Sequence, residues 1–329
     1  MKTIVYTPGD PAGLGPELLC RLLSAGKCRP GPGQRLVIVA TEPVLEQYCR
    51  LYGLAPFWTA VSHTGLLNDA PSGVYLLPPQ RIKPDQVQPG EPGVEGGKAA
   101  GECLLAAVDM LLSGSAGGLV TGPLNKAMLI RAGFDFPGHT EFLAEQSGLS
   151  PERVCMHLAG PELMVSLATT HVPLRRVPDM LTPERVLSCL RLTWEHIERL
   201  GLSGRPLAVC GLNPHAGEQG ELGSEEAAII QPAVRQACLE GVEAVGPLPA
   251  DTVFHRTWGG EFSAALAMYH DQGLGPLKLL HFGQAVNVTL GLPFVRVSVD
   301  HGTGYDLVGT GRAGTASLER AFELAWKLV

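Results

Sequence analysis

The sequence predicts an α/β fold with a largely parallel or mixed sheet, and three observations lead to this prediction. Short runs of β-branched and apolar residues alternate with longer segments of helical periodicity. Hydrophobic residues make up 45% of the 329 residues and charged residues only 17%, so the chain can bury large cores, about two at this length. The 41 glycines and 27 prolines indicate many turns and close backbone approaches, which are common around ligand sites of α/β proteins.

The individual elements follow from local patterns. Strands are predicted where short β-branched, apolar runs end in turn-forming residues, at 3–7, 36–40, 74–77, 118–121, 164–169, 207–211, 264–269, 286–290 and 294–299. Helices are predicted from their periodicity at 16–24, 43–51, 97–112, 126–132, 141–146, 183–200, 225–240 and 316–328. Thr182 and Pro183, for example, supply a capping oxygen and a preset φ angle at a helix start.

One long segment interrupts this alternation. Residues 78–97 are rich in proline and glycine and lack periodicity. A loop of this length is unusual in a compact domain and often covers a site. We consider both a lid and a plain surface excursion for it.

Charge and cysteine content limit the class of protein. The net charge is −7 and no basic stretch is present, which argues against binding to nucleic acid or an anionic membrane surface. The eight cysteines form no C-x-x-C motif and read mostly as small core residues. No apolar run is long enough for a signal peptide or a membrane helix, so we expect a cytoplasmic protein.

The sequence lacks the common catalytic and nucleotide-binding motifs. Residues 309–314 match G-x-G-x-x-G, but the acidic position that the dinucleotide fingerprint requires would fall beyond Val329. The chain therefore lacks a standard Rossmann fingerprint. It also lacks a Walker A loop, a G-x-S-x-G motif and an H-E-x-x-H motif.

Two glycine-flanked loops could bind an anion. Residues 7–17 follow the first strand and open a helix, so their backbone N–H groups could face an anion. The alternative is a tight structural turn in which Asp10 caps its own loop. His139 and Thr140 stand at another helix start, where imidazole, hydroxyl and free amides suit a phosphate or carboxylate, although Thr140 could simply cap the helix.

Three histidines each follow an apolar strand: His171, His215 and His270. Catalytic zinc sites commonly use three protein ligands and keep one open position. The spacing carries no local signature, so each histidine alone could equally be packed or solvated. Asp251 could orient a metal-bound water or a ligand histidine.

Three further polar residues flank the last predicted strands: Lys278, Asn287 and Arg296. Two cations and an amide suit a substrate with phosphate or carboxylate groups. Because Arg296 lies within an apolar run, it needs a partner, and a structural ion pair is the alternative.

At these residues the chain resembles the 4-hydroxythreonine-4-phosphate dehydrogenase family of pyridoxal phosphate biosynthesis. The motifs that carry the resemblance lie in order along nearly the whole chain: 9–17 (GDPAGLGPE), 121–126 (TGPLNK), 138–141 (GHTE), 212–218 (LNPHAGE), 268–273 (MYHDQG) and 287–293 (NVTLGLP), which runs on to 300–303 (DHGT). Each motif is weak alone, and together they are highly specific. Residues 303–309 depart from the family pattern, which leaves cofactor preference and substrate subgroup open.

The resemblance implies a two-domain fold similar to isocitrate and isopropylmalate dehydrogenases. Its expected domains are 1–133 with 290–329 on the cofactor side, and 134–289 for metal binding and dimerisation. It implies a homodimer in which one divalent ion (Zn, Mg, Co or Mn) binds His171 and His215 of one subunit and His270 of the other.

The resemblance also implies the ligand residues of substrate and cofactor. It assigns five residues to substrate binding: His139, Thr140, Lys278, Asn287 and Arg296. It places NAD or NADP near Asp300, His301, Gly302 and Thr303. Asp251 and Lys278 are the candidates for the general base.

The implied reaction is oxidation of 4-phosphooxy-threonine at its secondary hydroxyl, followed by decarboxylation to 3-amino-2-oxopropyl phosphate. A related family activity on another phosphorylated hydroxy acid, such as threonate or erythronate 4-phosphate, or on a carboxylated dihydrodiol is an alternative. A metal-dependent lyase or hydrolase that uses the same histidines without nicotinamide is another, and absorbance at 340 nm separates it. A non-catalytic anion-binding protein would show no turnover at all.

Overall fold

The computed structural model describes residues 1–79, 87–134 and 138–329. The chain forms two compact units, Met1–Gly148 with Pro293–Val329, and Leu149–Leu292. The second unit is thus inserted into the sequence of the first. These limits differ from the domain limits implied by the resemblance, because α5 (His139–Gln146) lies in the first unit.

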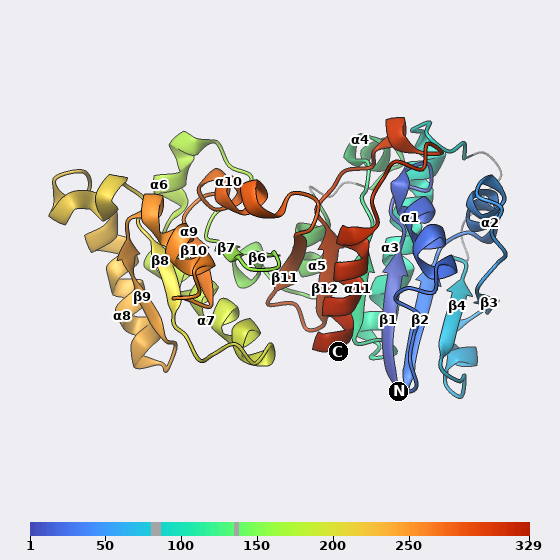
Figure 1. Ribbon diagram of the computed structural model, residues 1–329, viewed down its shortest axis with the longest axis horizontal. Coiled ribbons are helices and arrows are strands. Elements are labelled where there is room, and N and C mark those ends of the chain that lie inside the picture. The colour runs from blue at the N-terminus through green and yellow to red at the C-terminus, as the bar shows by residue number, and fades with distance from the viewer. Residues whose placement is uncertain (80–86, 135–137) are drawn as a thin grey trace. The chain divides into compact units, whose positions relative to one another are not determined.

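The first unit contains a parallel sheet with the order β3-β4-β2-β1-β5-β12. Its strands are β1 (Lys2–Thr7), β2 (Gln34–Val39), β3 (Thr59–Ala60), β4 (Gly73–Leu77), β5 (Gly118–Thr121) and β12 (Val295–Val299). Its helices are α1 (Leu14–Ser24), α2 (Glu42–Leu51), α3 (Val94–Leu112), α4 (Lys126–Arg131), α5 and α11 (Ala316–Leu328). Central strands β1 and β5 are almost wholly buried, as expected for a parallel sheet covered on both faces. Helix α11 packs on β12, β5 and β1, and α3 packs on β1, β2 and β5 (Figure 1).

The second unit contains a mixed sheet with the order β11-β6-β7-β10-β8-β9. Its strands are β6 (Cys155–Ala159), β7 (Met164–Leu167), β8 (Leu207–Cys210), β9 (Ala244–Leu248), β10 (Ala264–Ala267) and β11 (Val286–Leu290). Strand β6 runs antiparallel to both neighbours, whereas β7, β10, β8 and β9 are parallel. The helices are α6 (Val177–Met180), α7 (Pro183–Arg199), α8 (Gln231–Leu239), α9 (Ala250–Trp258) and α10 (His270–His281).

Alternation along β7 shows how this sheet is covered. Val165 and Leu167 join a core with side chains of α9 and α10, such as Val253 and Leu277. Ser166 points the other way, where its hydroxyl accepts a hydrogen bond of 2.7 Å from Thr193 of α7. Successive side chains of a strand face opposite sides, so α7 covers one face of the sheet and α9 with α10 the other.

The structure confirms the α/β fold class and every strand and helix predicted from the sequence, within a few residues at their ends. Among the described residues, six strands and α-helices were not predicted: β3, β6, β9, α6, α9 and α10. Part of the predicted 78–97 loop is wrong, because α3 already begins at Val94. Residues 80–86 of that loop lie outside the described residues, so the lid stays a prediction.

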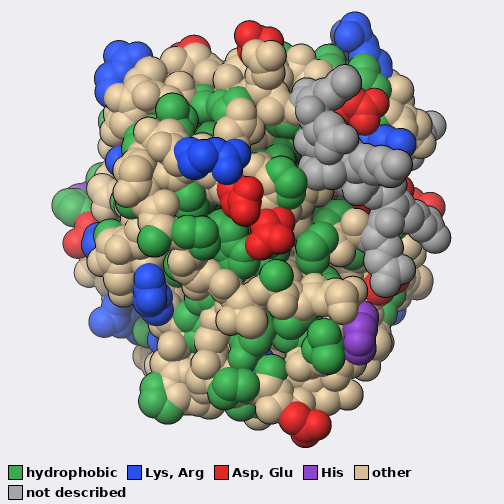
Figure 2. Space-filling model, turned by 90° about the vertical axis from the view of Figure 1, so that its right-hand side faces the viewer, with side chains coloured by type: hydrophobic (Ala, Val, Ile, Leu, Met, Phe, Trp, Pro, Cys, Tyr) green, Lys and Arg blue, Asp and Glu red, His purple; other side chains and the backbone are tan. Residues whose placement is uncertain are grey.

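The surface and the helices add two observations. Among the described residues on the face drawn in Figure 2, basic and acidic side chains are scattered among hydrophobic and uncharged ones. Across the described part of the chain, no helix combines the length and apolar character needed to span a membrane.

Candidate active site

The three predicted histidine ligands all lie in the second unit, after the carboxyl ends of neighbouring parallel strands. His171 follows β7, His270 follows β10 and His215 follows β8, and β10 pairs with both of the other strands. His171 and His215 are exposed and His270 is half-buried, so all three side chains are accessible to a ligand. The carboxyl ends of such strands are the usual location of ligand sites in α/β sheets.

The rings of His171 and His270 lie close together, with their centroids 5.4 Å apart. Nδ1 of His270 lies 2.7 Å from a carboxylate oxygen of Asp271. When Nδ1–H donates to that oxygen, the lone pair of Nε2 points away for a cation, and metal-binding histidines commonly have such a carboxylate partner. Within residues 1–79, 87–134 and 138–329 of one chain, no group of three or more His, Cys, Asp or Glu side chains stands close enough to hold a metal ion. The pair fits part of an imidazole site for a divalent ion, and a further ligand has to complete it.

Gln272 connects two of the histidine-bearing segments, and sequence reasoning did not single it out. Its Oε1 accepts a hydrogen bond of 2.7 Å from the N–H of Met268, and its Nε2 donates one of 2.7 Å to the carbonyl of Gly211. These bonds tie the end of β10 to the end of β8. Next to it, a Cβ on Gly273 would come within 2.6 Å of Val165, so only glycine allows α10 to pack this closely on β7.

His215 stands at the start of an unusual turn, Pro214–Gly220, which we call the His215 turn. Its φ angles are positive at six successive residues: His215 (52°), Ala216 (52°), Gly217 (82°), Glu218 (42°), Gln219 (59°) and Gly220 (101°). The left-handed conformation costs roughly 1–2 kcal/mol for each residue other than glycine. A turn of this kind persists only where surrounding contacts hold it, and such strain is concentrated at functional sites.

The two candidate general bases lie on helices that were not predicted. Asp251 is exposed in the first turn of α9, and α9 contacts the His215 turn. Lys278 is half-buried on α10, the helix that begins at His270.

In the first unit, the half-buried His139 lies near the buried guanidinium of Arg296. Arg296 is 3% exposed on β12, and its Nη2 donates to the hydroxyl of Thr121 at 3.1 Å. Burial lowers the pKa of Arg296 to about 10, and Glu141 acts in the opposite direction. Burial and the nearby Arg296 guanidinium hold the pKa of His139 well below its ordinary value, so this imidazole is neutral at pH 7. Thr140 follows His139 in the first turn of α5.

Several predicted ligand residues carry buried polar atoms without a hydrogen-bond partner among the described residues. These atoms are Nε2 of His139, Oδ1 of Asn287 and Nε2 of His301. Asn287 lies on β11 in the second unit, whereas His139 and His301 belong to the first. Other described side chains outside the site, such as His157 and Trp326, also have buried atoms of this kind, so these three atoms are open to a ligand but do not by themselves identify one.

The predicted cofactor segment, Asp300 to Thr303, follows β12. The N–H of Asp300 donates to the hydroxyl of Ser317 at 3.2 Å, and the carbonyl of Thr303 accepts a hydrogen bond of 2.9 Å from Leu14. Gly302 is exposed and has open space around its Cα. The following 309–314 segment comes after a short 3₁₀ turn, Tyr305–Leu307, instead of a strand, in agreement with the failed dinucleotide fingerprint.

The glycine-rich loop after β1 is a structural turn, so the structure favours that alternative over an anion site. The N–H groups of Asp10, Ala12, Gly13 and Leu14 are all bonded within the protein. The Asp10 carboxylate accepts from Ala12 N–H at 2.9 Å and from the Tyr305 hydroxyl at 2.7 Å. Burial raises the pKa of Asp10, against the effect of these hydrogen bonds. Burial and the Asp10 hydrogen bond raise the pKa of Tyr305 to about 12.

Glu17, at the other end of the same loop, also forms a hydrogen bond to a distant segment. It is fully buried, and its Oε2 accepts a hydrogen bond of 2.8 Å from the N–H of Gly309. Two carboxylates near the N-terminus therefore hold the chain segment that follows the predicted cofactor residues.

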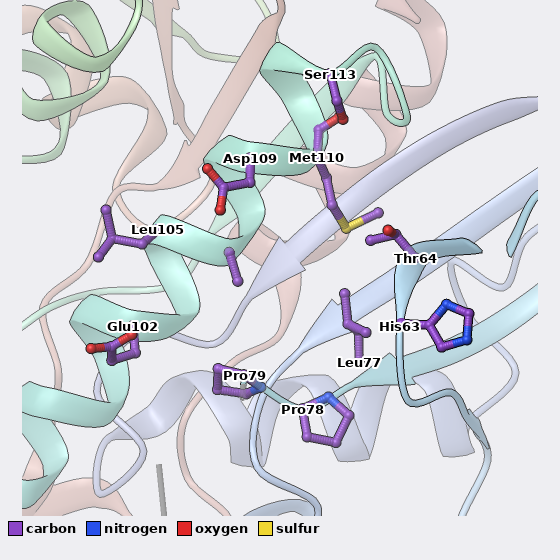
Figure 3. A pocket seen from close by; sticks show the side chains of 11 residues that line it. His63, Thr64, Leu77, Pro78, Pro79, Glu102, Leu105, Asp109, Met110 and Ser113 are labelled. Carbon is purple, nitrogen blue, oxygen red and sulfur yellow. The ribbon is translucent and has the colours of Figure 1, made fainter. Parts of the chain in front are cut away.

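A separate cavity of about 630 Å³ lies in the first unit, between one face of α3 and the end of β4 (Figure 3). Its lining combines apolar side chains with the carboxylates of Glu102 and Asp109. None of the predicted site residues contributes to it, so it is distinct from the site described above.

Comparisons with known proteins agree over nearly the whole chain. A family model described as "Pyridoxal phosphate biosynthetic protein PdxA" matches residues 33–325. A protein of Geobacter metallireducens named 4-hydroxythreonine-4-phosphate dehydrogenase is 45% identical over 325 residues, covering 98% of this chain and 94% of the relative. The crystal structure of a 4-hydroxythreonine-4-phosphate dehydrogenase from Klebsiella pneumoniae is similar at a TM-score of 0.85 with 36% identity, covering 99% of this chain and 98% of that chain.

More distant structures share the fold. A terephthalate 1,2-cis-dihydrodiol dehydrogenase from Burkholderia xenovorans has a TM-score of 0.71 and 25% identity, with coverage of 99% and 98% of the two chains. A beta-decarboxylating dehydrogenase from Thermococcus kodakarensis has a TM-score of 0.53 and 14% identity, covering 98% of this chain and 82% of that chain, which is a likeness of fold alone. The family model and the close relatives together show that this chain belongs to the PdxA family.

Proposed function

We propose that this protein oxidises 4-phosphooxy-threonine at its secondary hydroxyl with NAD or NADP and releases CO₂ to give 3-amino-2-oxopropyl phosphate, in pyridoxal phosphate biosynthesis. Membership of the PdxA family and the names of its close relatives support the substrate. The observation that carries the chemistry is the placement of three accessible histidines after the carboxyl ends of neighbouring parallel strands, with Nδ1 of His270 2.7 Å from the carboxylate of Asp271.

The residues of the second unit fit a divalent ion. His171, His215 and His270 would hold it, in a homodimer to which two chains contribute ligands. When bound, the ion supplies Lewis-acid chemistry to the substrate oxygen that gains negative charge, and the nicotinamide takes up the hydride. Asp271 fixes the ring of His270 through its 2.7 Å contact with Nδ1.

The anionic ends of the substrate require cations and donors in a shielded environment. Arg296, buried and charged, suits a phosphate or carboxylate. The neutral imidazole of His139 has a shielded Nε2 that can bond an oxygen of the same group. We assign Thr140, Lys278 and Asn287 to the same role.

The proton balance requires a base in the oxidation and an acid after decarboxylation. Oxidation breaks the C–H bond, whose electron pair leaves as hydride, and the O–H proton passes to a base. Loss of CO₂ then leaves an electron pair on carbon, which takes up a proton. The carboxylate of Asp251 and the amino group of Lys278 are the two groups that we propose for these transfers.

The cofactor would lie along Asp300, His301, Gly302 and Thr303. The orphaned Nε2 of His301 and the open space at Gly302 support this placement. The likeness to a beta-decarboxylating dehydrogenase supports a two-domain fold of the isocitrate and isopropylmalate dehydrogenase kind.

A related substrate is the second candidate, and one observation favours it. Tyr305 lies in the segment that departs from the family pattern, and its hydroxyl bonds Asp10 and Asn125 at 2.7 and 2.9 Å. The likeness to a dihydrodiol dehydrogenase at 25% identity keeps a carboxylated dihydrodiol among the alternatives, beside other phosphorylated hydroxy acids.

The test is a substrate panel followed at 340 nm with NAD and NADP, in the presence of Zn²⁺, Mg²⁺, Co²⁺ or Mn²⁺, and again with a chelator. We expect chelator-sensitive reduction of the nicotinamide with 4-phosphooxy-threonine. His215→Ala should lower turnover by at least about 100-fold, because a metal supplies several kcal/mol to the transition state. The control is His63→Ala, because His63 is an exposed histidine of the first unit, and this variant should keep the turnover of the wild type. Metal-dependent turnover of normal rate in His215→Ala would refute the assignment.

A further inference from the structure

Glu226 is a buried carboxylate whose hydrogen bonds all go to the segment that leads into the His215 turn. The residue is 5% exposed. Its Oε1 accepts from the N–H groups of Leu212 and Asn213 at 2.8 and 2.7 Å, and its Oε2 accepts from the side-chain amide of Asn213 at 3.0 Å. A buried carboxylate is costly unless it is fully bonded, and this one uses its bonds to fix backbone.

The His215 turn is wrapped around this carboxylate. A Cβ on Gly217 would come within 2.7 Å of Oε2 of Glu226, and one on Gly211 within 3.2 Å of Oε1. The turn therefore approaches the carboxylate more closely than larger residues would allow. Since six successive residues have positive φ and four of them are not glycines, the turn needs an external support.

We infer that Glu226 is a positioning residue that holds the His215 turn in its left-handed form and thereby aims the imidazole of His215 at a divalent cation. The inference rests on the proposed function, because it takes His215 as a metal ligand. Glu226 acts through the backbone of Leu212 and Asn213 and does not touch the cation itself.

The test uses the metal-free full chain and measures its affinity for Zn²⁺ by calorimetry. Glu226→Leu keeps most of the side-chain volume but removes both accepting oxygens, so the N–H groups of Leu212 and Asn213 lose their acceptor. We expect its Zn²⁺ affinity to fall about tenfold or more, which is the usual effect of losing a group that orients a ligand. Activity should recover as the Zn²⁺ concentration is raised, whereas His215→Ala should not recover.

Glu225→Leu is the matched control. Its carboxylate accepts from the same Asn213 side chain at 2.8 Å but bonds neither Leu212 nor Asn213 backbone. We expect its Zn²⁺ affinity to equal that of the wild type.

The outcomes separate the inference from the proposed function. Wild-type Zn²⁺ affinity in a folded Glu226→Leu overturns the inference, even when His215→Ala loses the metal. Wild-type affinity in His215→Ala overturns the proposed metal site itself. Where Glu226→Leu does not fold, Gly217→Ala decides, because it disturbs the turn and keeps the carboxylate: a loss of affinity supports the inference and an unchanged affinity overturns it.

Discussion

The glycine-rich loop after β1 and the His215 turn each lie against a buried carboxylate, Asp10 in the first and Glu226 in the second, but they differ in which side chains stay accessible. In the first, Asp10 and the backbone N–H groups bond one another and Tyr305, and the loop is closed upon itself. In the second, the Glu226 carboxylate accepts hydrogen bonds from the N–H groups of Leu212 and Asn213, while the ring of His215 stays exposed. Both segments are rich in glycine and polar residues, so such richness alone does not distinguish a structural turn from a ligand site. The exposed imidazole of His215 makes the distinction.

The largest expected effect comes from Arg296, which tests whether the first unit also has an open site. If Arg296 binds substrate, Arg296→Ala should raise the KM for the phosphorylated substrate about 10- to 100-fold, because a charged hydrogen bond contributes roughly 1.5–3 kcal/mol. Steady-state kinetics at saturating cofactor measure this.

Arg35→Ala is the control for Arg296→Ala. Arg35 is also a buried arginine of the same sheet and donates to the carbonyl of Leu67. It should lower the melting temperature and leave KM unchanged. An unchanged KM in Arg296→Ala would instead assign Arg296 to a structural ion pair.

A smaller effect, on stability alone, is expected at Asp10. Asp10→Asn keeps an oxygen for Ala12 but sets an amide against the Tyr305 hydroxyl, and we expect a loss of roughly 1–3 kcal/mol in the free energy of unfolding. Tyr305→Phe removes one of these bonds and should cost about 1 kcal/mol. Urea unfolding measures both. A raised KM for NAD at normal stability would show that the loop after β1 is a ligand site after all.

The smallest effect concerns pH and the core of the second unit. His157 is fully buried, with Nδ1 2.8 Å from the Ser166 hydroxyl, and burial followed by the neighbouring His196 holds its pKa well below the ordinary value. The unfolded chain binds a proton near pH 6.5, but the folded chain does not. The contribution to stability is therefore complete above about pH 6.5 and is lost below it, by about 1.4 kcal/mol per pH unit.

His157→Gln should remove this dependence. The free energy of unfolding should fall less between pH 7.5 and 5.5 in the variant than in the wild type, by about 1.4 kcal/mol. The wild-type slope also contains His139, whose pKa is depressed as well, so the difference between the two proteins is the quantity to measure. Equal slopes would contradict the assignment of His157 as a neutral core residue.

Strands that are buried on both faces were the easiest elements to predict, because a continuous apolar run is visible in the local sequence without knowledge of tertiary contacts. Helix α10 was missed since Gly273, Gly275 and Pro276 interrupt its periodicity, although Gly273 is there to let the helix approach β7. Strand β9 contains Gly246 and Pro247, which normally argue against a strand. In both cases tertiary packing outweighs local preference.

The sequence was enough to predict where the histidines of the candidate site lie, but not which residues hold them in place. Histidines after apolar strands pointed to the ends of β7, β8 and β10, and the structure places them there. The sequence gives no signal for the left-handed turn, since four of its six positive φ angles belong to residues other than glycine. Glu226 and Gln272 act on backbone groups of distant segments, and no local pattern reveals such bonds.

The insertion of the second unit has a consequence for synthesis of the chain. Residues 293–329 supply β12 and α11, which cover the edge of β5 and part of one face of the first sheet. A ribosome delivers them last, after the whole inserted unit has emerged. Until then the nascent first unit displays a bare strand edge and an uncovered apolar surface, the two features that invite aggregation. Premature truncation anywhere before β12 thus yields a species suited to chaperone capture or degradation instead of a stable fragment.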